Sequence, residues 1–130
     1  MTRIVRGAVM LAMLGAAACG GSSGGGPAGV DRNKQISAAT DADKGSLCDW
    51  FVAMVGGYGA APTCADGFLE APPDKTTCTT EFPMCNVTVA AFEDCVETIV
   101  AAQATCTAAS LTAAMANANC QAVGAAGCFN

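Results

Sequence analysis

The residues of this chain that could do chemistry are mainly its cysteines. The 130 residues include nine cysteines and no histidine. Without histidine, Ser-His-Asp and Cys-His catalysis, histidine-ligated zinc and the commonest general base are all excluded. From Cys48 onward, 6 to 15 residues separate neighbouring cysteines, so the Cys-x-x-Cys signature of zinc ribbons and thioredoxin-type redox sites is missing. We therefore expect no metal site and no cofactor.

Eight of the nine cysteines lie in the second part of the chain, and we expect them to form structural disulfides. Dispersed cysteines in even number are typical of a small exported domain that is stabilised by cross-links. Eight cysteines allow roughly a hundred different pairings, and their spacing does not choose among them. One hypothesis joins the two main predicted helices by a bond from Cys48 to Cys95 or Cys106. The predicted disulfide cysteines are Cys48, Cys64, Cys78, Cys85, Cys95, Cys106, Cys120 and Cys128.

The ninth cysteine, Cys19, lies between an apolar run and a tract rich in glycine and serine. Residues 1–18 carry only Arg3 and Arg6 as charges, followed by the apolar residues 7–18, which is typical of a secretory signal peptide. As a helix, this run would span about 18 Å, less than the roughly 30 Å of a bilayer core. The letters "AAAC" that end at Cys19 resemble the lipobox of bacterial lipoproteins. The resemblance implies a lipid anchor on Cys19; the alternative is cleavage by the ordinary signal peptidase, which leaves a soluble secreted protein.

Two further features favour lipidation of Cys19. An odd thiol is unusual in an oxidising compartment, and setting Cys19 aside leaves eight cysteines that can all pair. The tract "GGSSGGGPAG" is typical of a flexible tether, and about 16 such residues reach roughly 20–24 Å. We therefore predict a signal peptide at 1–18, a lipidated cysteine with its tether at 19–35, and one domain at 36–130. Gly20 stands where enteric bacteria place an aspartate for inner-membrane retention, so the resemblance favours the outer membrane of the cell envelope.

The charge of the mature chain limits its partners. Removing Arg3 and Arg6 leaves four basic residues against eleven acidic ones, a net charge of −7. Such a surface has no electrostatic footprint for nucleic acid or for anionic lipid. We expect contact with the membrane only through the anchor at Cys19, and a protein partner in the envelope whose identity the sequence does not give.

The pattern of apolar residues predicts an all-α, small disulfide-rich domain of two to three helices with long loops pinned by disulfides. The first helix is predicted from a cap at Thr40 to Gly56-Gly57, and the second begins at a cap near Thr88. A weaker helix is expected at 110–117. Residues 56–85 contain several dipeptides with glycine or proline that favour turns, such as Gly-Gly, Asp-Gly and Pro-Pro, and are predicted to be mostly loop.

Acidic residues offer the remaining candidates for chemistry. A calcium-binding EF-hand loop that began at Asp41 would need glycine at its sixth position and glutamate at its twelfth, where this chain has Ser46 and Val52. Residues 41–46 are therefore better explained as a helix N-terminus. Glu93, Asp94 and Glu97 could supply paired carboxylates, but Glu93 and Glu97 are predicted to share a solvated helix face opposite the apolar one. Tyr58 is predicted to be a packing residue.

The stretches "LCDWFVAMVGGYG" (47–59) and "TVAAFEDC" (88–95), with the spaced single cysteines, resemble small cysteine-rich predicted lipoproteins of myxobacteria. The resemblance implies a fold and an address but no activity. We therefore predict a membrane-anchored cell-envelope lipoprotein with a non-catalytic structural or partner-binding role. One alternative is a carrier of a small apolar ligand between helices. Another is a histidine-independent hydrolase, which would need Ser46 with Lys44, or carboxylates converging in a cleft, the candidates being Asp49, Asp66 and Glu70.

Overall fold

A computed structural model of the chain describes residues 25–64 and 68–129. These residues form helices and no β-strand, apart from two isolated β-bridges, which confirms the prediction of an all-α domain. The helices are more numerous than the two or three expected. In order they are the 3-10 helix η1 (Ile36–Ala38), α1 (Asp41–Met54), α2 (Lys75–Thr80), α3 (Val89–Ala102), α4 (Ala108–Met115) and α5 (Ala118–Ala125).

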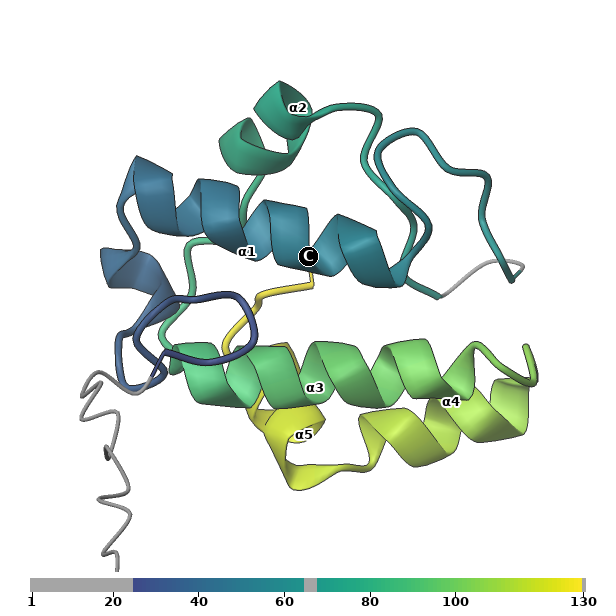
Figure 1. The fold of residues 1–130 in the computed structure, drawn as a ribbon. Helices are drawn as coiled ribbons and strands as arrows, with labels where there is room; N and C mark the ends of the chain where they lie inside the picture. Colours follow the sequence, from purple (N-terminus) through teal and green to yellow (C-terminus); the bar gives the residue numbers. More distant parts are fainter. Residues whose placement is uncertain (1–24, 65–67, 130) are drawn as a thin grey trace, which may run out of the picture.

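The helices are arranged in two halves (Figure 1). In one half α2 packs against α1, and in the other α4 and α5 pack against α3. The two halves face each other across a shared core in which Leu47 of α1 and Val96 of α3 are both buried. Side chains fill the space between α1 and α3, so large apolar residues supply the contact between the two halves.

All eight predicted cysteines are paired, in four disulfides. Two of them act within a half, linking α1 to α2 and α3 to α5. The other two join distant segments: the loop after α1 to the loop after α3, and the α2–α3 connection to the C-terminal tail. The pairs are Cys48–Cys78, Cys95–Cys120, Cys64–Cys106 and Cys85–Cys128. The hypothesis of a bond from Cys48 to Cys95 or Cys106 is wrong, because all three cysteines have other partners: Cys48 is bonded to α2, Cys95 to α5, and Cys106 to the loop after α1.

The starts of the two main helices follow the predicted caps. The Thr40 side chain accepts a hydrogen bond from the Asp43 backbone N–H, and the Asp43 carboxylate accepts one from the Thr40 N–H, so the two residues form a capping box. At the start of α3, Thr88 accepts a hydrogen bond from the Ala91 N–H. After α1 the chain turns through Gly56, whose φ of 101° is favourable only for glycine.

Two short helices were not expected from the sequence. Helix α2 lies inside residues 56–85, which were predicted to be mostly loop; it is capped by Asp74 and carries Cys78, which is bonded to α1. Helix α5 is capped by Asn117 and carries Cys120, which is bonded to α3. A disulfide to a longer helix therefore stabilises each short helix in its place.

The ordered domain begins earlier than residue 36. Residues 25–35, which we call the strap, were predicted to belong to a flexible tether. Instead Val30 is only 3% exposed, and the backbone N–H groups of Val89 and Ala90 donate to strap carbonyls, those of Lys34 and Arg32. The strap is thus part of the domain, while the predicted signal peptide, Cys19 and residues 20–24 lie outside the described residues.

Candidate functional site

A groove of about 410 Å³ opens between the two halves of the domain. We call it the apolar groove, because its walls are mostly aromatic, aliphatic and proline side chains from both halves. Phe51 comes from α1, Val96 from α3 and Leu69 from the long loop between α1 and α2, while Phe129 belongs to the C-terminal tail. The groove therefore exists only because segments distant in the sequence meet at this place.

Packing contacts give the apolar groove its shape. The rings of Phe82 and Phe92, both buried, lie with their centroids 5.7 Å apart and tilted by 54°. Buried Gln103 donates a hydrogen bond from Nε2 to the Leu69 carbonyl at 2.8 Å, which fixes the loop that forms one wall. The Cys85–Cys128 disulfide brings the tail to the mouth of the groove, where Phe129 stays 38% exposed.

The charges that line the apolar groove are all negative. Glu70 and Glu81 are exposed at its edge, and among the described residues no lysine or arginine lines it. Within the part of the chain that the structure describes, neither carboxylate takes part in an ion pair. The groove therefore combines an apolar interior with an uncompensated negative edge.

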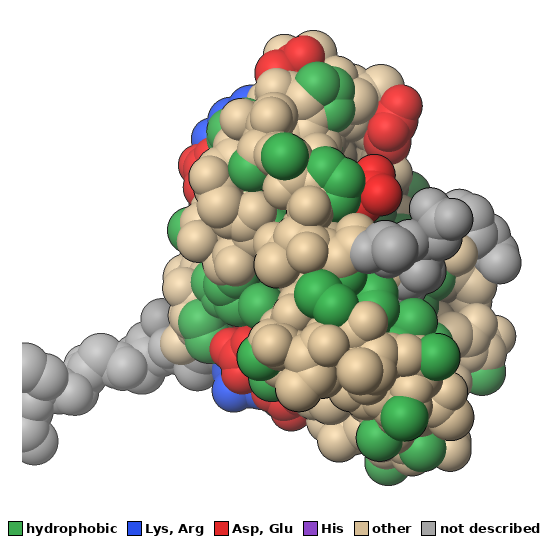
Figure 2. Space-filling model, turned by 90° about the vertical axis from the view of Figure 1, so that its right-hand side faces the viewer, with side chains coloured by type: hydrophobic (Ala, Val, Ile, Leu, Met, Phe, Trp, Pro, Cys, Tyr) green, Lys and Arg blue, Asp and Glu red, His purple; other side chains and the backbone are tan. Residues whose placement is uncertain are grey.

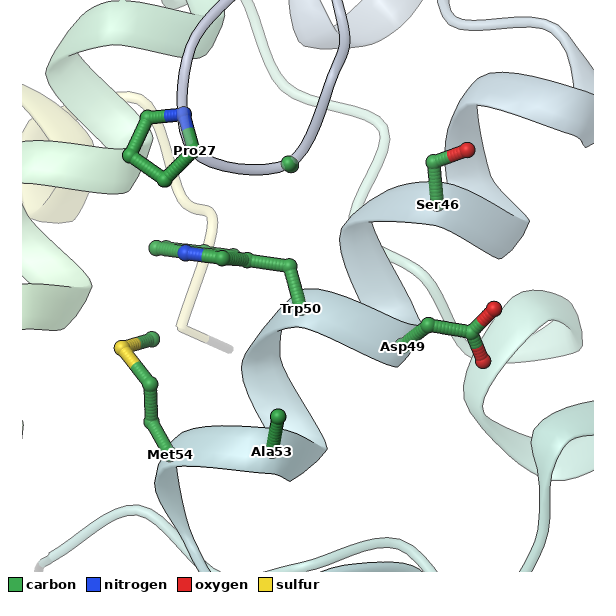
Figure 3. Close-up of a pocket in the computed structure, with 7 residues that line it drawn as sticks. Pro27, Ser46, Asp49, Trp50, Ala53 and Met54 are labelled. Carbon is green, nitrogen blue, oxygen red and sulfur yellow. The ribbon is translucent and has the colours of Figure 1, made fainter.

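A second, more open hollow of about 560 Å³ lies over α1 beside the strap (Figure 3). Trp50 and Met54 project from one side of α1 toward Pro27 of the strap, whereas Asp49 projects from another side, toward α2. Trp50 is half-buried, so its indole serves mainly to pack the strap against α1. This hollow is a shallow surface with no convergent polar groups on the Trp50 side.

Asp49 is held in a small polar cluster. Its carboxylate accepts hydrogen bonds from Lys75 Nζ at 2.6 Å and from the Tyr58 hydroxyl at 2.9 Å. These two donors lower the pKa of Asp49, while burial and the hydrogen bond to Asp49 raise the pKa of Tyr58 to about 12. Both groups thus stay in one protonation state near neutral pH, which does not suit acid–base catalysis. Tyr58 links the end of α1 to this cluster besides packing.

The residues considered for a hydrolase are not brought together. Asp49 and Glu70 line different hollows, and Asp66 lies outside the described residues. Lys44 is paired with Asp41, with 3.6 Å between Lys44 Nζ and an Asp41 carboxylate oxygen. No arrangement within residues 25–64 and 68–129 therefore supplies a catalytic pair from these candidates.

Glu93 was predicted to be solvated, and this prediction is wrong. Its side chain is fully buried beneath the strap, where Oε1 accepts a hydrogen bond from the Ala28 N–H at 3.2 Å. Its Oε2 lies 3.4 Å from Nε of Arg32 and has no hydrogen-bond partner among the described residues. Burial raises the pKa of Glu93, although the Ala28 hydrogen bond and Arg32 act in the opposite direction.

Gly26 makes this arrangement possible. A Cβ atom on Gly26 would lie 2.1 Å from Glu93 Oε2, so only glycine leaves room for the carboxylate. The acidic cluster predicted on α3 is therefore divided. Asp94 pairs with the Arg32 guanidinium and Glu97 stays exposed, while Glu93 fastens the strap. Nothing in the sequence pattern of α3 signalled this burial, because the strap that covers Glu93 lies about 65 residues away.

Residues 25–64 and 68–129 contain neither a cluster of metal ligands nor a membrane-spanning helix. The structure brings together no group of three or more His, Cys, Asp or Glu side chains that could hold a metal ion in its described part. The longest described helices have 14 residues, and none combines the length and apolarity needed to cross a bilayer.

Comparisons with protein-family models, curated proteins and solved structures gave no match to this chain.

Proposed function

We propose that this chain is a lipid-anchored protein of the cell envelope whose disulfide-linked domain binds a partner without catalysing a reaction. The observation that carries the proposal is the pairing of the cysteines. The described residues contain eight cysteines, all in disulfides with one another, and the ninth is Cys19. No other cysteine of the chain is therefore left to form a disulfide with Cys19. This is what we expect of a cysteine that carries a different modification.

The position of Cys19 supports the same proposal. It follows a short apolar run with arginines before it, and its "AAAC" context resembles a lipobox. Two or three acyl chains on one residue are sufficient for stable anchoring. Four disulfides suit an oxidising compartment outside the cytoplasm. By analogy with bacterial lipoproteins, Gly20 favours the outer membrane.

The strap shortens the distance between the anchor and the domain. Gly25 pairs with Asp31 inside the strap, so six residue steps separate Cys19 from this first paired residue of the domain. Fully extended, they span at most roughly 20 Å. The domain would therefore stay within about its own diameter of the membrane surface, and its net negative charge would keep it from adsorbing to anionic lipid.

The mass of the intact protein tests this proposal. The full chain is expressed in a bacterial host and extracted from the membranes, and a Cys19→Ala variant is treated in parallel. We expect a chain that begins at Cys19, is heavier by a diacylglyceryl group with or without an N-acyl chain, and is lighter by the eight hydrogens of four disulfides. The variant should leave the membrane fraction. An unmodified mature chain in the soluble fraction would refute the anchor.

A second candidate function is that of a carrier for a small apolar ligand, and the apolar groove favours it. Its volume of about 410 Å³ lies within the range of roughly 300–1,000 Å³ that is usual for ligand pockets. Phe51, Phe82 and Phe92 provide aromatic surface from both halves of the domain. The ligand would lie between helices α1 and α3.

The uncharged fluorescent probe N-phenyl-1-naphthylamine tests the carrier role. We expect its emission to rise on binding to the domain with a saturable stoichiometry of one. Ala71→Trp places a large side chain in the groove and should abolish the signal, whereas Ala113→Trp, on the exposed surface of α4, should leave it unchanged. Equal signals from both variants would show that the probe binds elsewhere.

A further inference from the structure

The acidic side chains of this domain differ in whether they have partners. The described residues contain ten of them, and seven accept hydrogen bonds or form ion pairs within the domain. The three without such a partner in the described part are Glu70, Glu81 and Glu97. Two of these three line the apolar groove, and Glu97 lies on the exposed surface of α3.

The basic side chains are all engaged elsewhere. Arg32 pairs with Glu93 and Asp94, and each of the three lysines in the described part pairs with an aspartate. On the face drawn in Figure 2, acidic side chains on the right of the upper part have no basic neighbour, whereas those on the left lie beside basic ones. Apolar side chains extend across the middle of the same face. The described domain thus has no spare cation with which to neutralise the edge of the groove.

From this charge complementarity we propose that the apolar groove binds a cationic amphiphile, a small molecule with an apolar body and one ammonium group. The apolar body would occupy the space between Phe51, Phe82, Phe92 and Val96. The ammonium group would lie at the exposed edge, next to Glu70 and Glu81. This inference rests on the proposed carrier role of the groove and specifies the class of ligand.

The two parts of such a ligand contribute differently. Burial of the apolar body supplies most of the affinity, because the interior of the groove is aromatic and aliphatic. Each exposed carboxylate strengthens binding of an ammonium group by at most about fivefold. Together Glu70 and Glu81 should favour a cationic head group over a neutral one by about tenfold, and should disfavour an anionic one.

Three probes with the same octyl chain test this preference: octyltrimethylammonium, octyl glucoside and octyl sulfate, each below its micelle-forming concentration. Binding is measured by displacement of N-phenyl-1-naphthylamine and by calorimetry on the folded domain. We expect the cationic probe to bind about tenfold more tightly than the neutral one, and the anionic probe most weakly. The preference should shrink as salt is added, because exposed ion pairs are screened.

Variants locate the effect at the groove. The double change Glu70→Gln and Glu81→Gln should make the cationic and neutral probes equal, whereas Glu97→Gln, which removes an unpaired carboxylate away from the groove, should keep the tenfold preference. If the double variant does not fold, the two single variants and the salt dependence give the same test. Equal binding of neutral and cationic probes to the unaltered domain would overturn the inference while leaving the carrier role intact. If no octyl probe and no naphthylamine binds, both fail.

Discussion

The Cys64–Cys106 disulfide should be decisive for the stability of the domain. It closes a loop of 42 residues and ties the segment after α1 to the turn after α3. In the chain-entropy model, opening a loop of this length costs about 4 kcal/mol of unfolding free energy. The variant that removes it without adding a polar group is Cys64→Ala with Cys106→Ala.

The backbone at Cys106 allows a sharper version of this prediction. Its φ is 49°, in the left-handed region that costs a residue with a side chain about 1 kcal/mol relative to glycine. The alanine double variant keeps this cost, whereas Cys64→Ala with Cys106→Gly relieves it. We therefore expect a loss of about 4 kcal/mol for the first variant and about 3 kcal/mol for the second.

Urea unfolding, followed by circular dichroism and analysed by linear extrapolation, measures both losses. Removal of Cys95–Cys120 by alanine substitutions is the comparison, because it closes only 25 residues and lies wholly in the core. It should cost about 3.5 kcal/mol from loop closure, plus lost packing. A loss below about 1 kcal/mol for the Cys64–Cys106 variants, or no gain from glycine at position 106, would refute the reasoning.

Four smaller changes test other contacts. Glu93→Gln should become increasingly stabilising relative to the wild type as the pH rises above 4.5, because burial raises the pKa of Glu93 in the folded state. If urea titrations give the same difference in unfolding free energy between variant and wild type at every pH, this explanation is contradicted. Gly26→Ala should cost about 1–3 kcal/mol, and less when Glu93→Ala is also present, as a double-mutant cycle would detect. Thr40→Ala should cost about 1 kcal/mol in the same urea assay. Asp43→Asn should raise the midpoint pH of acid unfolding, because hydrogen bonds from Lys34 and Thr40 hold the pKa of Asp43 at about 2 in the folded state. The ionised carboxylate therefore stabilises the fold at pH values above its ordinary pKa, and this stabilisation is lost as the pH falls toward 2. An unchanged midpoint would show that these bonds do not stabilise the fold.

The sequence was sufficient to predict the helices that carry their own signals. Helices α1 and α3 have a threonine cap, an apolar face and enough length, and they begin where Thr40 and Thr88 predicted. The all-α class and the pairing of eight cysteines followed from similar local or compositional features. Helices α2 and α5 were missed, because their 6 and 8 residues carry little local preference and depend on disulfides to α1 and α3.

The connectivity of the disulfides, the apolar groove and the burial of Glu93 were decided only by the tertiary structure. Spacing along the chain does not determine which cysteines meet, and the groove needs walls from α1, α3, a loop and the tail. Glu93 has the local sequence of a solvated residue, and it is buried because the strap with Gly26 packs over it. Caps and periodicity act over a few residues and can be predicted from the sequence, whereas contacts between segments 25 to 65 residues apart depend on how the whole chain packs.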